Sequence, residues 1–338
     1  MTLHRVIRCQ TGTGVKNLSL QFTKKNKIMK LTEEQKKKYS SAIKQGFVTD
    51  EPGFWHTFCG TWVRKHPGRT SLLVRLRDIL GRNPEWSDMT DDTISDLKDD
   101  MKEQLAPNSV RTICAELRAV LNRNKATKPI PAETFPLILR SKRVPSQAVY
   151  LTPVELKTLH LYQPRTPRER YVKEMFMREC LTGARSVDCR CFTSANIHEE
   201  DGTKYLTYVP RKHPIVVTVP VHKWLMQYMH EDWPEEYLMS RQDHNNEILQ
   251  RVCRKAGITA RSRVYVAGKT ETGPKWHFIA SHTGRRTFAT LLSLKGCPLE
   301  QIAIMMGHVN GNTPNVMMTA AYICEKSKIS KSVLALFN

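Results

Sequence analysis

One basic, proline-rich stretch divides this chain and constrains its fold more than any other feature. Residues 128–147 read KPIPAETFPLILRSKRVPSQ and contain four prolines. Proline lacks a backbone N–H and disfavours helix in the residue before it, so this stretch predicts an extended linker. The run 152–155 that follows, Thr-Pro-Val-Glu, supplies an N-cap, a proline at the first helical position and a glutamate at N3. A chain of 338 residues is therefore predicted to hold two domains, the second beginning at this helix.

The linker and the charge pattern predict four segments. Residues 1–45 form a basic N-terminal segment, whose first 30 residues carry seven Lys or Arg and no acid, as is typical of a tail or a DNA-contacting arm. Residues 46–128 form a small helical domain, 129–150 the linker and 151–338 the second domain. Apolar residues at the chain end predict a short terminal helix that docks on a neighbouring copy: Ile329, Val333, Leu334, Leu336 and Phe337.

The first domain shows helical periodicity in two places. Thr90 is placed to cap a helix with apolar positions at Ile94, Leu97 and Met101. After Pro107, apolar residues recur along one face of a second helix. Arginines on its opposite face, and basic residues of the linker, are candidate contacts to a phosphate backbone: Arg111, Arg118, Arg123, Arg140, Lys142 and Arg143.

The second domain is predicted to be mainly helical with one small β island. Residues 205–209 and 215–219 are β-branched or aromatic runs, and the PRKHP sequence between them predicts a hairpin with Lys212 at its tip. Helices are predicted to resume at His222 and over 245–256. The fold class is therefore mainly α with a small β-hairpin or sheet island.

The net charge indicates the class of partner. Lys and Arg total 53 against 32 Asp and Glu, a formal charge of +21, which favours a polyanion such as nucleic acid. No run of about 18 apolar residues occurs in the sequence, so no membrane span is predicted. Nine cysteines without CxxC spacing argue against a disulfide framework and a structural zinc site.

Four stretches of the second domain carry residue types suited to phosphate chemistry. An apolar helix is predicted to end at Gly183, with Arg185 at the junction to the next helix and Asp188 shortly after. Lys212 stands on the hairpin. His282 and Arg285 share one face at the start of a helix, where anions are favoured. The remaining candidates follow in the sequence: His308, directly after Gly307, and Tyr322, on a helix predicted to begin with Thr313 as N-cap and Pro314 at N1.

Together these stretches resemble the tyrosine recombinase, or phage integrase, family, most closely integrases of mobile elements and prophages of the Bacteroides type. The family has an arginine in a TGxR context followed by an acid, a hairpin lysine, an HxxR, a GH pair and a terminal tyrosine. This chain supplies them in that order, and the resemblance covers about residues 50–338. It implies a SAM-like helical core-binding domain in front of a catalytic domain. The gap between His308 and Tyr322 is longer than is commonest, with residues 310–312 interpreted as extra loop.

The resemblance implies a role for each residue. Tyr322 attacks a DNA phosphodiester, leaving a 3′-phosphotyrosine and a 5′-hydroxyl. Arg185 and Arg285 clamp the phosphate oxygens bidentately. Lys212 protonates the leaving oxygen, and Asp188 orients the basic groups. His282 and His308 bond the phosphate and manage the tyrosine proton. No cofactor and no metal are implied.

The family also implies its partners and its location. These are double-stranded DNA attachment sites, a homotetramer on DNA and a DNA-bending accessory protein, in the bacterial cytoplasm at the nucleoid. Two alternatives stay open: a type IB topoisomerase that relaxes DNA without exchanging partners, and a non-catalytic DNA-binding regulator of the same fold. Recombination by the protein would distinguish the integrase from both.

Overall fold

A computed structural model describes residues 31–144, 148–266, 268–311 and 313–325. The chain forms two compact units that divide between Pro145 and Ser146. We call them the helical unit and the C-terminal unit. The acid-free residues 1–30 and the apolar chain end at 329–337 lie outside the described residues. Within the described ranges, no helix is long and apolar enough to cross a membrane.

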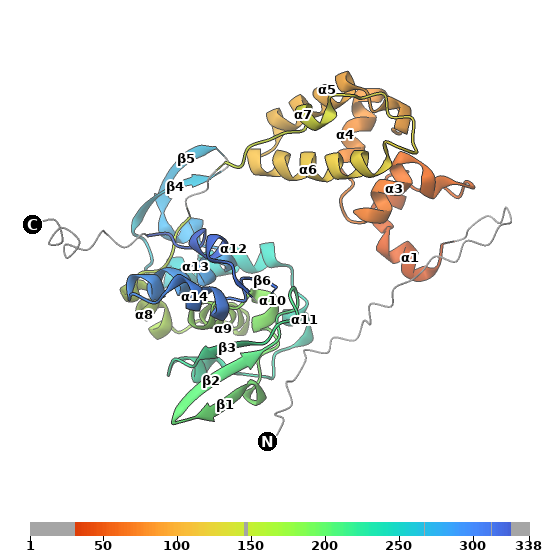
Figure 1. Ribbon diagram of the computed structural model, residues 1–338. Helices are drawn as coiled ribbons and strands as arrows, with labels where there is room; N and C mark the ends of the chain where they lie inside the picture. Colours follow the sequence, from red (N-terminus) through yellow and green to blue (C-terminus); the bar gives the residue numbers. More distant parts are fainter. Residues whose placement is uncertain (1–30, 145–147, 267, 312, 326–338) are drawn as a thin grey trace, which may run out of the picture. The chain divides into compact units, whose positions relative to one another are not determined.

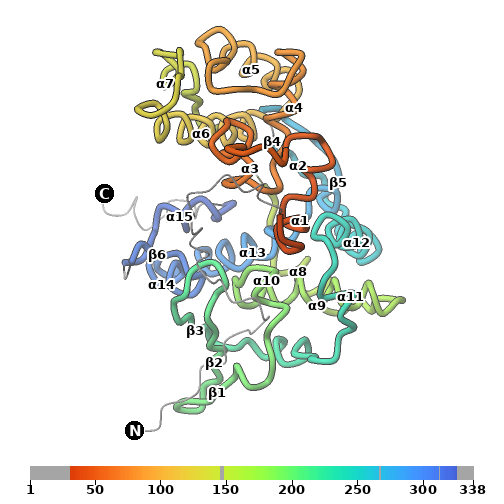
Figure 2. The backbone as a smooth tube through the Cα atoms, turned by 90° about the vertical axis from the view of Figure 1, so that its right-hand side faces the viewer, coloured from red at the N-terminus to blue at the C-terminus, as the bar shows by residue number. Residues whose placement is uncertain are grey.

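The helical unit contains short helices packed around one apolar core (Figure 2). Its helices are α1 (Glu33–Lys38), α2 (Ser40–Lys44), α3 (Phe58–Lys65), α4 (Ser71–Leu80), α5 (Asp91–Gln104), α6 (Pro107–Asn124) and α7 (Phe135–Ile138), with 3-10 turns η1 (Phe54–His56) and η2 (Trp86–Asp88). As predicted, the Thr90 side chain caps α5 by accepting a hydrogen bond from the backbone N–H of Thr93 at 3.1 Å.

Helix α6 has the two faces that its sequence predicts. Its buried face packs into the core through Val110, Cys114, Leu117, Val120 and Leu121. The side chains of Arg111, Arg118 and Arg123 are exposed on the other side. The apolar residues of the helix thus pack in the core, and its three arginines remain accessible to solvent or a ligand.

The structure differs from the predicted segments at both ends of this unit. Residues 129–144 are not a free linker, because Phe135 and Leu139 are buried in the core and α7 forms there. Asn108 also exchanges two hydrogen bonds with the backbone of Val144. Tyr39 and Ala42 are buried too, so residues 31–45 belong to the helical unit. In both places burial of apolar side chains outweighs the proline-rich or basic composition of the segment.

The C-terminal unit is mainly helical with small antiparallel sheets (Figure 1). Its helices are α8 (Pro153–Leu161), α9 (Pro167–Thr182), α10 (Ser186–Cys189), α11 (Glu235–Leu238), α12 (Gln242–Lys255), α13 (Ser281–Leu294), α14 (Leu299–Met305) and α15 (Val316–Ala320), with 3-10 turns η3 (Ser194–Asn196), η4 (Leu225–Tyr228) and η5 (Lys275–Phe278). The predicted capping box at Thr152 is present at the start of α8.

The predicted hairpin is part of a three-stranded sheet in the order β1-β2-β3. Strands β2 (Thr203–Tyr208) and β3 (Val217–Pro220) pair in register Leu206 with Val219 and Tyr208 with Val217. Three further elements were not predicted: β1 (Ile197–Glu200) and the hairpin of β4 (Arg261–Val266) and β5 (Lys269–Pro274). Finally, β6 (Val309–Asn310) pairs with β7 (Thr313–Pro314).

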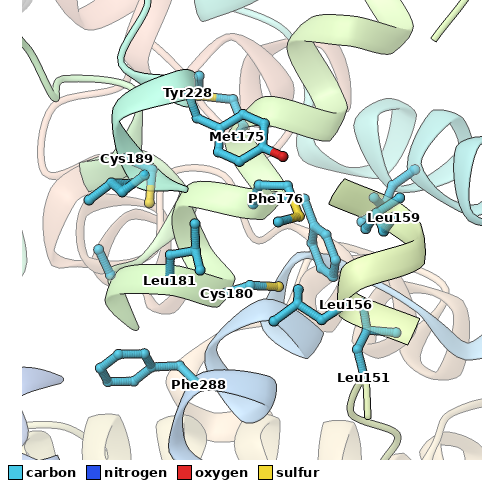
Figure 3. Packing of buried hydrophobic residues seen from close by; sticks show 14 of the residues in the cluster. Leu151, Leu156, Leu159, Met175, Phe176, Cys180, Leu181, Cys189, Tyr228 and Phe288 are labelled. Carbon is cyan, nitrogen blue, oxygen red and sulfur yellow. The ribbon is translucent and has the colours of Figure 1, made fainter. Parts of the chain in front are cut away.

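Helix α9 lies at the centre of this unit, and its apolar side chains meet those of neighbouring helices (Figure 3). Met175, Phe176 and Cys180 of α9 pack in one cluster with Phe288 of α13. The two helices approach closely at Gly284, where an added Cβ would lie 2.6 Å from the Cβ of Glu179. Any larger residue at 284 would force α9 and α13 apart.

Arg178, also on α9, is almost fully buried and bonds only to backbone carbonyls among the described residues. Its guanidinium donates to the carbonyls of Tyr228, Cys189, Phe192 and His230 at 2.5, 2.7, 3.3 and 2.6 Å. These carbonyls follow or end η4 and α10. One planar side chain therefore satisfies the ends of two short elements and fixes both against α9.

Replacement of Arg178 by lysine should destabilise the C-terminal unit although the charge is kept. A lysine ammonium cannot reach four carbonyls in one plane, so we expect a loss of about 2–4 kcal/mol in the free energy of unfolding. Denaturant unfolding of the full chain measures it, with Arg170→Lys, an exposed arginine of the same helix, as the matched control. Equal free energies of unfolding for Arg178→Lys and Arg170→Lys would contradict this account.

Candidate active site

Four segments of the C-terminal unit bring the candidate residues together. Arg185 lies at the N-cap of α10, directly after α9 ends at Gly183 with φ 66°. His282 and Arg285 are in the first turns of α13, and His308 follows the end of α14. Tyr322 lies in the turn after α15. Figure 2 shows α13, α14, β6 and α15 on one side of the unit.

The start of the last helix differs from the prediction. Thr313 and Pro314 do not begin it; they form β7, paired with β6 across a turn at Gly311, whose φ is 59°. The helix begins two residues later than predicted, at Val316, and the Asn315 side chain caps it by accepting from the N–H of Met318 at 2.9 Å. Asn310, interpreted above as part of an extra loop, instead lies in strand β6, and residue 312 lies outside the described residues.

Arg285 is almost fully buried in the site, with 1% of its surface exposed. One terminal nitrogen, Nη1, donates to the carbonyl of Gly183 at the end of α9. The other, Nη2, donates to the carbonyl of Met306 at 3.2 Å and to Nε2 of His308 at 2.8 Å. Its Nε–H is buried and has no hydrogen-bond partner among the residues that the structure describes. Arg285 thus fixes the ends of α9 and α14 relative to α13.

His308 is 1% exposed and bonds through both ring nitrogens. Nε2 accepts from Arg285, and Nδ1 lies 3.1 Å from Oγ1 of Thr319 on α15. Burial, followed by the positive charges of Arg285, Arg185 and His213, lowers the pKa of His308 to about 3. The imidazole is therefore neutral at physiological pH. With both nitrogens bonded within the chain, it acts here on Arg285 and on α15.

The ring of Tyr322 lies among these cationic and imidazole groups. The Cζ atoms of Arg285 and Arg286 are 5.4 and 5.6 Å from its centroid. The His308 ring is at 4.9 Å and the His282 ring at 6.4 Å, the latter nearly perpendicular. Arg286 also donates to the carbonyl of Ala321 at 3.4 Å. The candidate nucleophile is therefore held beside two guanidinium groups, as a developing negative charge requires.

Arg185 and His282 complete the positive side of the site. Partial burial and the charge of Arg285 lower the pKa of Arg185, although Asp188 opposes this effect. Desolvation and the charges of Arg285, Arg286 and Arg185 likewise lower the pKa of His282, whose side chain reaches solvent. Like charges depress one another in this way when no anion separates them. The site is thus arranged for an anion.

Asp188 ties the β2–β3 loop to α10. Its carboxylate is buried, and Oδ1 accepts the backbone N–H of Arg211 at 2.9 Å. The next residue, Lys212, has an exposed side chain, and no hydrogen bond or ion pair joins it to the other candidates in the described part of the chain. Because His213 lowers the pKa of His308, this loop borders the site. Lys212 therefore lies on a segment anchored at the site, with its own side chain free to move.

The other candidate DNA contacts belong to the helical unit and are not part of this cluster. Arg140, Lys142 and Arg143 are exposed after α7, as the three arginines of α6 are exposed on that helix. Within the described ranges, no group of three or more His, Cys, Asp or Glu side chains is arranged to hold a metal ion.

Sequence reasoning missed two residues of the site. Arg286 follows Arg285 directly, but helical spacing places consecutive residues about 100° apart and gave no reason to expect both at one ring. Thr319, three residues before Tyr322, carries no charge and matched no motif. Its signal is positional, since i and i+3 share one side of a helical turn.

No protein-family model matches the chain, and no curated protein matches it by sequence. Solved structures do. The chain is similar to a lambda integrase dimer bound to a core site, with 15% identity, a TM-score of 0.55 and coverage of 79% of this chain and 95% of that one. It is similar to the Tn1549 transposon integrase in complex with transposon right end DNA, with 14% identity and a TM-score of 0.54; the match covers 82% of this chain and 96% of that one. It is also similar to XerH site-specific recombinase bound to a palindromic difH substrate, with 12% identity and a TM-score of 0.51; the match covers 75% of this chain and 74% of that one.

At these identities the likeness establishes the fold. The chain combines a helical domain with a mainly helical domain that contains small antiparallel sheets, the architecture of these integrases and recombinases. The fold class predicted from the sequence is confirmed.

The low pKa of His308 predicts a pH dependence of stability. In an unfolded chain histidine titrates near 6.5, above the folded value of about 3, so protonation favours unfolding. The stabilisation is complete above pH about 6.5 and decreases as the pH falls toward 3. When the pH is lowered from about 7 to about 5, the free energy of unfolding of wild type should fall by about 1–2 kcal/mol more than that of His308→Gln. Denaturant unfolding at both pH values measures this, and parallel losses would contradict the assignment.

Proposed function

We propose that this protein is a site-specific DNA recombinase that cleaves and rejoins duplex DNA through Tyr322. The observation that carries the proposal is the convergence of Tyr322 with Arg285, Arg286 and His308 from separate elements of the C-terminal unit. The fold shared with lambda integrase and the Tn1549 integrase supports the same reading.

We assign the following roles in the proposed reaction. The phenol oxygen of Tyr322 attacks the phosphorus, and neutral His282 takes the phenol proton. Arg185, which is partly exposed, binds the non-bridging oxygens. Arg285, whose terminal nitrogens bond within the chain, adds its positive charge. The bond from phosphorus to the 5′ oxygen breaks, and Lys212 gives that oxygen a proton. A 5′-hydroxyl from another strand reverses these steps and completes the exchange.

The location of His282 supports phosphate binding. It lies in the first turn of α13, a helix of 14 residues whose positive dipole end favours an anion. Asp188 assists by holding the loop of Lys212 through Arg211. The conserved energy of the phosphotyrosine makes an external energy source unnecessary for ligation.

The exposed cations of the helical unit suit the backbone of the same duplex. We infer that the six basic side chains on α6 and after α7 contact phosphates on either side of the cleavage point. We further propose that the protein integrates or excises a prophage or other mobile element inside a bacterial cell. In this reaction four protomers act on two attachment sites, with a DNA-bending accessory protein. On a supercoiled plasmid, recombinants indicate an integrase, whereas relaxation alone indicates a topoisomerase.

Replacement of Tyr322 by phenylalanine should abolish covalent capture of a nicked suicide substrate. The change removes one oxygen and keeps the ring among its neighbours, so DNA affinity should stay within about twofold of wild type. Gel electrophoresis of the protein–DNA adduct and a binding titration measure the two quantities.

The control is Tyr205→Phe, which removes a phenol oxygen from strand β2 instead. Adduct formation by Tyr322→Phe at the wild-type rate, or recovery of a DNA-linked peptide from wild type that contains another tyrosine, would refute the assignment of the nucleophile.

DNA binding should weaken steeply with salt, because each neutralised phosphate releases counterions. With about six phosphate contacts, affinity should fall by about a thousandfold between about 50 and 200 mM salt. Joint replacement of Arg111, Arg118 and Arg123 by alanine should reduce the slope of log affinity against log salt by about three. A slope unchanged by the triple substitution would remove α6 from the interface.

A further inference from the structure

Thr319 connects the helix before Tyr322 to the His308–Arg285 pair. The side chain of this threonine is fully buried on α15. Its Oγ1 donates to the carbonyl of Asn315 at 3.0 Å and lies 3.1 Å from Nδ1 of His308. The carbonyl of Thr319 accepts the backbone N–H of Tyr322 at 2.8 Å. A single residue thus touches both the imidazole and the turn that carries the tyrosine.

The hydrogen-bond partners determine which nitrogen of His308 carries the proton. The guanidinium of Arg285 can only donate, so Nε2 must accept from it and carries no proton. A neutral ring then has its proton on Nδ1, which donates to Thr319. The hydroxyl of Thr319 has one proton, and it is directed to the carbonyl of Asn315. Every donor in this chain of contacts meets an acceptor.

The backbone closes the same arrangement. The N–H of Asn315 donates to the carbonyl of His308 at 2.7 Å, so the start of α15 is bound to His308 directly. Thr319, one turn later, is bound to its ring. These two attachments hold the single turn of α15 against the imidazole and leave Tyr322 on the residues that follow.

We propose that Thr319 is a positioning residue: by accepting the Nδ1 proton of His308, it ties the orientation of the His308–Arg285 pair to the seating of the Tyr322 segment. Seating of α15 favours the tautomer that can accept from Arg285. Without the Thr319 acceptor, the buried Nδ1–H loses its hydrogen bond, and the ring is no longer held in the orientation that meets Arg285. The role in catalysis rests on the proposed function, but the hydrogen-bond arrangement does not.

Nitrogen NMR of the full chain, labelled with ¹⁵N-histidine, tests the arrangement at neutral pH. His308 is assigned by the loss of its signals in His308→Gln. In wild type we expect a protonated Nδ1 and an unprotonated Nε2. Thr319→Val keeps the shape but removes the acceptor, so the Nδ1 resonance should shift as its N–H loses the hydrogen bond. Thr319→Ser keeps the hydroxyl and should restore the wild-type pattern. A wild-type ring protonated on Nε2, or the same pattern in Thr319→Val as in wild type, would overturn the proposal.

Covalent capture on the suicide substrate supplies the second measurement. Thr319→Val should slow capture by about tenfold, the scale of one lost buried hydrogen bond, with DNA affinity within about twofold of wild type. Thr319→Ser should recover the rate. Equal impairment of the serine and valine variants would overturn the positioning role. If wild type itself forms no adduct, the proposed function fails, and the tautomer measurement alone decides the role of Thr319.

Discussion

The hydrogen bonds of Arg285 to the ends of α9 and α14 are the interaction on which the candidate site depends. A guanidinium removed from water needs acceptors, and carbonyls at the C-terminus of a helix lack partners within the helix. Gly183 and Met306 provide such carbonyls, so one contact resolves both deficits. The same side chain then presents its remaining face to Tyr322 and its Nη2 to His308. Arg285 therefore both fixes the elements that form the site and contributes to its positive charge.

Arg178 uses the same principle in the core of the C-terminal unit. Its four carbonyl partners fix α10 and η4, and α10 in turn begins with Arg185 and presents Asp188 to the β2–β3 loop. Backbone carbonyls do not titrate, and a buried contact is weakly screened by salt. The cations that build the fold thus differ in environment from the exposed ones on α6, which are placed to respond to ionic strength.

The sequence predicts the helix caps and the buried faces of helices better than it predicts the tertiary contacts. The caps of α5 and α8 and the two faces of α6 follow from residue type and spacing, and the structure has them. The start of α15 does not, because a Thr-Pro pair and a following asparagine are equally good caps and the pairing of β6 with β7 selects the second. Hairpin β4–β5 was missed because β4 has only the short run Val264-Tyr265-Val266 and β5, KTETGP, has no large apolar residue. The partners of Arg178 and Arg285 are carbonyls, which every residue has, so no pattern of side chains could predict them.

The crowding of Arg185, Arg285, Arg286 and His282 around Tyr322 implies a trade-off between stability and function. In the free protein, burial and the neighbouring positive charges lower the pKa of Arg185 and of His282, so that like charges repel one another in the folded state. A bound polyanion relieves that repulsion. Selection for thermal stability alone would therefore favour neutral residues at these positions and produce a sturdier, inert protein, a bias that any engineering of this scaffold has to work against.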